Sequence, residues 1–134
     1  MPFVLDNSVV RGWYLENQAS PYTEAIAARL QDDRALVPAV WELEFANVLR
    51  TACVRQRMNA AAAQSVIDQV MSLPIEVDRL PAPPGEILAL SLRFGLSAYD
   101  ASYLALALRL QVPIATQDED LRTAARASGV GLAS

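Results

Sequence analysis

The sequence contains no histidine and no lysine, and it has a single cysteine, Cys53. Without histidine, Ser-His triads, imidazole acid/base catalysis and imidazole metal sites are excluded. Without lysine, P-loops, Schiff-base enzymes and lysine-dependent aspartyl-phosphate chemistry are excluded. One cysteine allows no internal disulfide, fits a reducing cytoplasm and, with no histidine present, disfavours a zinc site. Carboxylates are the groups that remain, and carboxylates gathered together favour a hard cation such as Mg²⁺ or Mn²⁺.

Long apolar runs are also missing. No stretch approaches the roughly 20 residues that a membrane span requires, and no basic segment precedes an apolar one near the start, so we expect neither a membrane anchor nor a signal peptide. The 134 residues show no linker or repeat, which predicts a single domain over residues 1–134. The hydrophobic content of 53% supports an ample core and leaves apolar surface for a partner. A net charge of −4 argues mildly against nucleic acid as a partner.

The hydrophobic pattern predicts alternating strands and helices. Helices separate every pair of strands, which indicates an α/β fold with a parallel sheet and helices on both faces. The strand over 74–77 alternates and is therefore expected near an edge. We expect strands over 3–5, 35–37, 74–77 and 113–116, with 130–132 as a further candidate, and helices over 8–17, 21–31, 40–57, 60–72, 84–95, 99–110 and 118–128.

The first candidate for chemistry is Asp6, which ends the apolar run of residues 3–5. An apolar run without alternation suits a strand that is buried on both faces. A carboxylate at the carboxyl end of a central strand lies where open α/β sheets place their sites. The alternative is that Asp6 or Ser8 only caps the helix that follows.

Two further acids also lie at the starts of helices. Asp100 falls in line with Leu104, Ala107 and Leu108, the inward stripe of its helix, where a charge must be paired, hydrogen-bonded or bound to a metal. The alternative is a capping box over residues 97–100. Asp118 follows the strand over 113–116 and could be a simple N-cap, with Thr116 and Glu119 forming a rival capping box.

The helix over 40–57 carries two acids, Glu42 and Glu44, that both border its apolar stripe. Asn47 and Thr51 accompany Glu44 at helical spacing, which slightly favours Glu44. The carboxyl ends of parallel strands and the starts of the following helices share one rim of the sheet. Carboxylates that converge there would repel one another unless a cation neutralised them. Such sites polarise phosphodiesters and activate water. The four candidate acids are Asp6, Glu44, Asp100 and Asp118.

Four segments around these acids resemble the motifs of PIN-domain ribonucleases. They are residues 4–10 (VLDNSVV), 44–49 (EFANVL), 96–107 (LSAYDASYLALA) and 115–121 (ATQDEDL), and their size and arrangement are similar to VapC-type toxins of toxin–antitoxin pairs. The second motif selects Glu44 over Glu42. The resemblance implies a three-layer α/β/α fold with parallel strand order 3-2-1-4-5. It also implies RNA cleavage dependent on Mg²⁺ or Mn²⁺, dimerisation and inhibition by a cognate antitoxin.

We therefore expect a cytoplasmic, metal-dependent endoribonuclease in which Asp6, Glu44, Asp100 and Asp118 hold one or two ions. Its expected partners are single-stranded or loop RNA and an antitoxin, as a homodimer or a toxin–antitoxin hetero-oligomer. The alternative is a catalytically silent PIN-like scaffold that binds RNA or protein, and a DNA-directed nuclease would use the same acids. The sequence leaves open the RNA target, the metal number and any role of Asp120 or Glu42. Expected helpers that orient the acids are Ser8, Asn47 and Thr116. The candidates for phosphate contacts are Arg11, Arg50, Arg55 and Arg57, and the alternative for each of them is a surface residue that only aids solubility.

Overall fold

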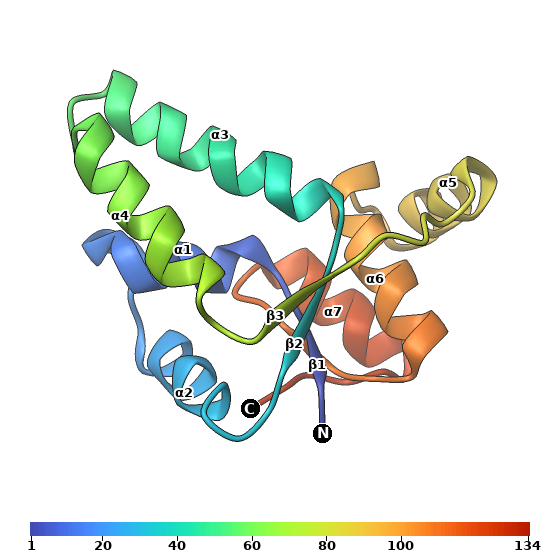
Figure 1. Ribbon diagram of the computed structural model, residues 1–134. Coiled ribbons are helices and arrows are strands. Elements are labelled where there is room, and N and C mark those ends of the chain that lie inside the picture. Colours follow the sequence, from blue (N-terminus) through green and yellow to red (C-terminus); the bar gives the residue numbers. More distant parts are fainter.

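A computed structural model describes all 134 residues of the chain except the side chain of Glu16. Over these residues the sheet has four parallel strands in the order β3-β2-β1-β4. The strands are β1 (Phe3–Leu5), β2 (Ala35–Pro38), β3 (Ile75–Asp78) and β4 (Ile114–Ala115). This confirms the predicted α/β class, the central position of β1 and the edge position of the third strand. Figure 1 shows the strands between two groups of helices.

The predicted order 3-2-1-4-5 is wrong in its last member, because the described residues form no fifth strand. Residues 130–132 contribute one isolated bridge, between Leu132 and Ile114. Ile114 N–H donates to Gly131 O at 3.1 Å, and Ala133 N–H donates to Ile114 O at 2.8 Å, so the pairing surrounds a single residue. Gly131 has φ = +76°, in the left-handed region, which interrupts an extended run. The chain therefore touches the edge of β4 without forming a ladder.

The helices follow the predicted pattern but several are shorter. Figure 1 shows α1, α2 and α4 on one side of the strands and α5, α6 and α7 on the other, the three-layer arrangement. The first helix ends at Tyr14, followed by a short 3-10 turn over Glu16–Gln18, and the long third helix ends at Val54. The helices are α1 (Asn7–Tyr14), α2 (Pro21–Arg29), α3 (Val40–Val54), α4 (Ala60–Met71), α5 (Pro84–Phe94), α6 (Ala98–Leu110) and α7 (Glu119–Ser128).

Local sequence signals explain most helix ends. Ser20 caps α2 in a reciprocal capping box with Thr23, and Pro21 occupies the first helical position. Asn59 caps α4 by accepting from Ala62 N–H at 2.8 Å. Gly95 ends α5 with φ = +65°, a conformation that glycine adopts without steric cost. The starts of α2 and α4 match the predicted positions, and α5 ends within one residue of the predicted end.

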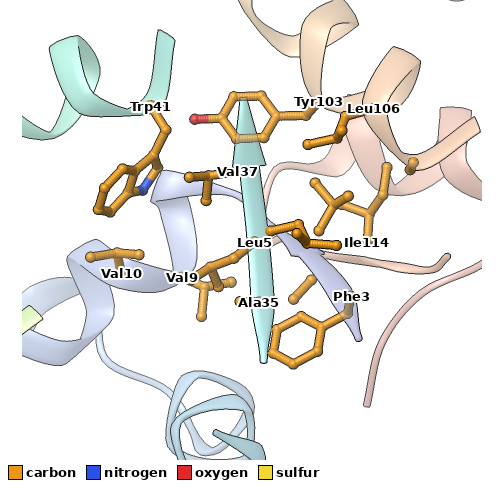
Figure 2. Packing of buried hydrophobic residues seen from close by; sticks show 14 of the residues in the cluster. Phe3, Leu5, Val9, Val10, Ala35, Val37, Trp41, Tyr103, Leu106 and Ile114 are labelled. Carbon is orange, nitrogen blue, oxygen red and sulfur yellow. The ribbon is translucent and has the colours of Figure 1, made fainter. Parts of the chain in front are cut away.

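The core lies on both faces of β1, whose three residues are fully buried. Figure 2 shows Phe3 and Leu5 among side chains from β2, α1 and α6, with Trp41 of α3 and Tyr103 of α6 above them. The Tyr103 ring is fully buried and its hydroxyl points toward α3 (Figure 2). Two packed faces hold the end of β1, and hence Asp6, in a fixed place. Across the described residues, no helix has the length and apolar character needed to cross a bilayer.

Candidate active site

Asp6 directly follows β1, and its side chain is only 5% exposed. It occupies the N-cap position of α1, yet its side chain makes no capping hydrogen bond. Instead, Oδ2 accepts hydrogen bonds from the Ser8 and Thr116 hydroxyls, each at 2.7 Å. Burial raises the pKa of Asp6, and the two hydroxyls and the charge of Arg11 act in the opposite direction. The capping alternative therefore does not describe the Asp6 carboxylate.

The two hydroxyls that hold Asp6 also tie the β4–α7 loop to α1. Ser8 Oγ accepts from Gln117 N–H at 2.8 Å, and Thr116 Oγ1 accepts from Asp118 N–H at 3.0 Å. Each hydroxyl has one proton, and both protons are used on Asp6. The 3.2 Å approach of Ser8 Oγ to Thr116 Oγ1 is therefore a contact between two acceptors in this arrangement. The network fixes the orientation of Asp6 and places Asp118 beside it.

Glu44 lies in the second turn of α3 and is partly buried. Its Oε1 accepts a hydrogen bond from the Tyr103 hydroxyl at 2.6 Å. Burial raises the pKa of Glu44, the Tyr103 bond lowers it, and the charge of Asp6 raises it. The neighbouring Glu42 instead forms a two-pronged ion pair with Arg79, at 2.8 and 3.0 Å. The structure thus separates two glutamates that helical periodicity could not.

Asp100 lies in the first turn of α6 and is partly buried. Its backbone N–H donates to Ser97 Oγ at 3.1 Å, so Ser97 caps this helix. A capping box would also require Ser97 N–H to donate to the Asp100 carboxylate. This second hydrogen bond is not formed among the described residues. Burial raises the pKa of Asp100 to about 6, with further contributions from the charges of Asp6, Asp118 and Glu44. Asp100 therefore faces the other acids.

Asp118 is the N-cap of α7, and its Oδ1 accepts from Leu121 N–H at 2.9 Å. The capping alternative is therefore observed for this residue. The rival box of Thr116 and Glu119 is not, because Asp118 is the N-cap of α7 and the Thr116 hydroxyl accepts from Asp118 N–H. The charge of Asp118 still raises the pKa values of Asp6 and Asp100. Asp118 combines a structural hydrogen bond with a place at the edge of the acid cluster.

The four acids converge electrostatically, but they do not form a finished metal cage. Among the described side chains, no three acidic, cysteine or histidine groups lie close enough together to enclose an ion. Mg²⁺ usually keeps several waters and takes only one or two carboxylates, so such wide spacing is compatible with it. Buried carboxylates with raised pKa values also favour a nearby cation. The donor set, all oxygen, therefore fits a hydrated Mg²⁺ or Mn²⁺ ion.

The remaining predicted site residues lie either beside Asp6 or on and around α3. Ser8 and Thr116 bond to Asp6, as described above. Asn47 is exposed on α3 and lines a cavity of about 240 Å³ together with Arg11, Arg55 and Arg57. Arg50 is exposed on the same helix but does not line this cavity. The four arginines are therefore not equivalent.

Sequence reasoning missed two residues that shape the site. Tyr103 hydrogen-bonds Glu44 and follows Asp100 by three positions, so both lie on one face of α6. Its neighbours in the sequence are apolar, and this pattern indicates only a place in the hydrophobic core. Gln117 bridges three segments through its side chain, which donates to Ser8 O at 3.0 Å and Gln18 O at 3.1 Å and accepts from Ser20 Oγ at 2.9 Å. Helical spacing from Asp100 was an available signal for Tyr103. No local signal marked Gln117.

Comparison with known proteins identifies the family to which the chain belongs. Residues 3–127 match the PIN domain family. Ribonuclease VapC12 of Mycobacterium tuberculosis, from strains CDC 1551 / Oshkosh and ATCC 25618 / H37Rv, is 33% identical over 99 residues, which cover 74% of this chain and 75% of the relative. The crystal structure of PAE2754 from Pyrobaculum aerophilum superposes with a TM-score of 0.72 at 23% identity, covering 94% of this chain and 86% of that chain. The last likeness concerns the fold alone.

Proposed function

Because the chain belongs to the PIN-domain family and is similar to a VapC-type ribonuclease, we propose that it is a divalent-metal-dependent endoribonuclease, the toxin of a toxin–antitoxin pair. One observation carries the proposal. Asp6, Glu44, Asp100 and Asp118 come from four segments far apart in the sequence, and the charges of the other three raise the pKa of Asp100. A purely structural role for these acids does not require that the other three act on Asp100.

The proposed roles follow from the contacts. Asp6, Glu44, Asp100 and Asp118 hold Mg²⁺ or Mn²⁺, which when bound supplies Lewis-acid activation of the phosphodiester and of the attacking water. Ser8 and Thr116 keep one oxygen of Asp6 occupied, so the other, Oδ1, would be available to hold the ion. Tyr103 does the same for Glu44, leaving Oε2 for the ion. These hydrogen bonds orient the carboxylates before the ion arrives, which lowers the cost of binding it.

Arginines beside the acids supply the positive charge that an RNA backbone needs. The chain as a whole is acidic, with a net charge of −4, so contacts to RNA have to be local. Arg11 acts electrostatically on both Asp6 and Glu44, which places a cation at the border of the acid cluster. We propose single-stranded or loop RNA as the substrate, because its phosphates and bases are accessible to such a small surface.

A cognate antitoxin is the proposed protein partner, in a homodimer or a toxin–antitoxin assembly in the cytoplasm. An apolar groove of about 630 Å³ lies at the carboxyl end of β2 and β3, between these strands and α5 and α6. Val40, Leu80, Ile87 and Leu106 contribute to its lining, and Leu80 is 67% exposed. A groove of this kind accepts an amphipathic helix or an extended tail. An arginine of the antitoxin placed against the acids would compete with the metal ion.

Cleavage of RNA by the purified protein tests the proposal. We expect activity with Mg²⁺ or Mn²⁺, complete loss in EDTA, and loss of nearly all activity in Asp6→Asn and Asp100→Asn with the fold retained. Full activity in either variant would disprove the site assignment. A folded protein that binds RNA but never cleaves it, with any divalent ion, would support the silent scaffold instead.

A further inference from the structure

A second, basic pocket lies between α1 and the far end of α3. It has a volume of about 240 Å³ and is lined by Arg11, Arg55 and Arg57, together with the polar side chains of Asn47 and Thr51. No carboxylate from the described side chains lines it. A water molecule takes about 30 Å³ in the liquid, so the pocket has room for a phosphate group and several waters.

The pocket arginines differ from four other arginines of the chain in having no ion pair with the described side chains. Arg29, Arg34, Arg79 and Arg109 each form an ion pair with a nearby carboxylate. Arg11, Arg55 and Arg57 form none with the described side chains, and Arg11 Nε is shielded from solvent without a hydrogen-bond partner among them. A shielded guanidinium nitrogen without an acceptor is costly, and an anion in the pocket would supply the acceptor.

The turn after α3 brings two of these arginines to the same cavity. Gln56 N–H donates to Cys53 O at 3.0 Å and Arg57 N–H donates to Ala52 O at 2.9 Å, the pair of bonds of a Schellman motif. Gln56 occupies its left-handed position with φ = +60°, where glycine is the usual residue. The turn reverses the chain between Arg55 and Arg57, so both side chains reach one pocket.

The pocket continues from the acid cluster along one face of α3. Glu44, Asn47, Thr51 and Arg55 follow one another at helical spacing, and the rise of 1.5 Å per residue puts Thr51 about 10 Å along the axis from Glu44. Arg11 joins the two regions, since its charge lowers the pKa values of Asp6 and Glu44 while its side chain lines the pocket. A chain-like ligand could occupy both places at once.

We propose that this pocket binds a backbone phosphate of the RNA that flanks the phosphodiester at the acids, with Arg11, Arg55 and Arg57 as the cationic contacts. The choice of RNA as ligand rests on the proposed function. Three guanidiniums supply more donors than one carboxylate of a protein partner can accept, whereas an RNA backbone offers two non-bridging oxygens on each phosphate and further oxygens on the adjoining sugars. Asn47 and Thr51 add neutral donors on the same side. The pocket would set the direction in which the RNA strand crosses the site.

Binding of a fluorescent, unstructured RNA in EDTA tests the proposal without cleavage. We expect Arg55→Ala with Arg57→Ala to weaken binding about tenfold, and to reduce the slope of log K against log salt by about 0.7 for each phosphate that the protein no longer neutralises. Arg93→Ala with Arg126→Ala is the matched control, because it removes the same two charges from exposed arginines outside the pocket. Thermal melts establish that each variant is folded. Equal decreases in affinity for the control and the double variant would overturn the pocket.

Inorganic phosphate provides a test that is independent of RNase activity. Its titration should shift the NMR signal of Arg11 Nε–Hε, and the double variant should abolish the shift. If phosphate and RNA bind there but no RNA is cleaved with any metal ion, the pocket stands and the proposed enzymatic function falls. If the double variant binds RNA and phosphate like the wild type but loses a protein inhibitor, the pocket recognises protein carboxylates and our assignment is wrong.

Discussion

The Tyr103 hydroxyl donates a 2.6 Å hydrogen bond to Glu44 Oε1, joining α6 to α3 at the acid cluster. Tyr103 is fully buried, so this hydroxyl is held in place by the packing of the whole ring. Burial and the charges of Asp6 and Glu44 raise the pKa of Tyr103, which keeps the hydroxyl protonated and donating. A core residue therefore directs a carboxylate of the candidate site.

Tyr103→Phe should reduce the affinity for Mg²⁺ or Mn²⁺ by about 10- to 100-fold, because the carboxylate loses the bond that orients it. Isothermal titration calorimetry measures this directly, without an activity assay. The phenyl ring is retained, so the melting temperature should change little. Tyr14→Phe is the control, since the Tyr14 hydroxyl is buried without a hydrogen-bond partner among the described residues. Equal metal affinities for wild type and Tyr103→Phe would refute the positioning role.

Removal of the Asp100 charge should stabilise the metal-free protein in a pH-dependent way. The pKa of Asp100 is about 6 in the folded state, raised from 3.8 by burial and then by the neighbouring acids. The folded state thus binds this proton more tightly than the unfolded chain, and the resulting penalty grows as the pH rises from about 4 to about 6. Below this window Asp100 is neutral in both states and the penalty vanishes.

Melting temperatures of wild type and Asp100→Asn in EDTA measure this difference. They should coincide near pH 4, and the variant should melt higher at pH 7.5. Contributions from the acids with lowered pKa, such as Asp33 and Asp78, are common to both proteins and cancel. Mg²⁺ should narrow the difference by stabilising the wild type, by about 2.7 kcal/mol at a hundredfold excess over its dissociation constant. A variant that melts far below wild type at pH 7.5 in EDTA would make Asp100 a structural residue.

Glu44→Gln and Glu42→Gln should have opposite consequences although the residues are two positions apart. Glu44→Gln removes a charge that faces Asp6 and should abolish most cleavage. Glu42→Gln breaks only the exposed ion pair with Arg79, which costs at most about 1 kcal/mol of stability, and cleavage should be unchanged. Rates of RNA cleavage at saturating metal decide between them. A larger loss in Glu42→Gln would mean that the wrong glutamate has been placed in the site.

The sequence predicted those parts of the fold that depend on local chemistry. The apolar run of β1, the Ser20 and Asn59 caps and the glycine after α5 each act within a few residues. The end of α3 was placed three residues too late, at Arg57 instead of Val54, because Gln56 takes a left-handed conformation without the glycine that would have signalled it. Residues 130–132 carried an apolar pattern, but the positive φ of Gly131 limits them to one bridge.

The candidate site divides in the same way. Acids at strand ends and helix starts could be recognised in sequence, because topology alone brings those positions to one rim of the sheet. Which hydroxyl holds which carboxylate depends on side-chain contacts across more than 100 positions, as between Asp6 and Thr116. Arg50 and Arg55 look alike in sequence, and only the tertiary packing of α1 against α3 gives one of them a pocket.

The close approach of α1 and α2 helps to hold Arg11 of α1 and Asp6 at the N-cap of this helix, and Gly12 makes the approach possible. A Cβ added at Gly12 would lie 2.5 and 2.8 Å from Thr23 side-chain carbons and 2.9 Å from Gln18 O, contacts that real side chains do not make. Gly12→Ala should therefore push the helices apart and cost about 1–3 kcal/mol in the free energy of unfolding. Gly85→Ala in α5 meets nothing within 4 Å and should stabilise the protein by up to about 1 kcal/mol. Urea denaturation of the two variants measures both changes. If the two substitutions prove equally neutral, α1 and α2 are not held as closely as the structure has them.

The same pair of variants tests the position of Arg11. Because Arg11 precedes Gly12 directly, Gly12→Ala should also weaken RNA binding, whereas Gly85→Ala should not.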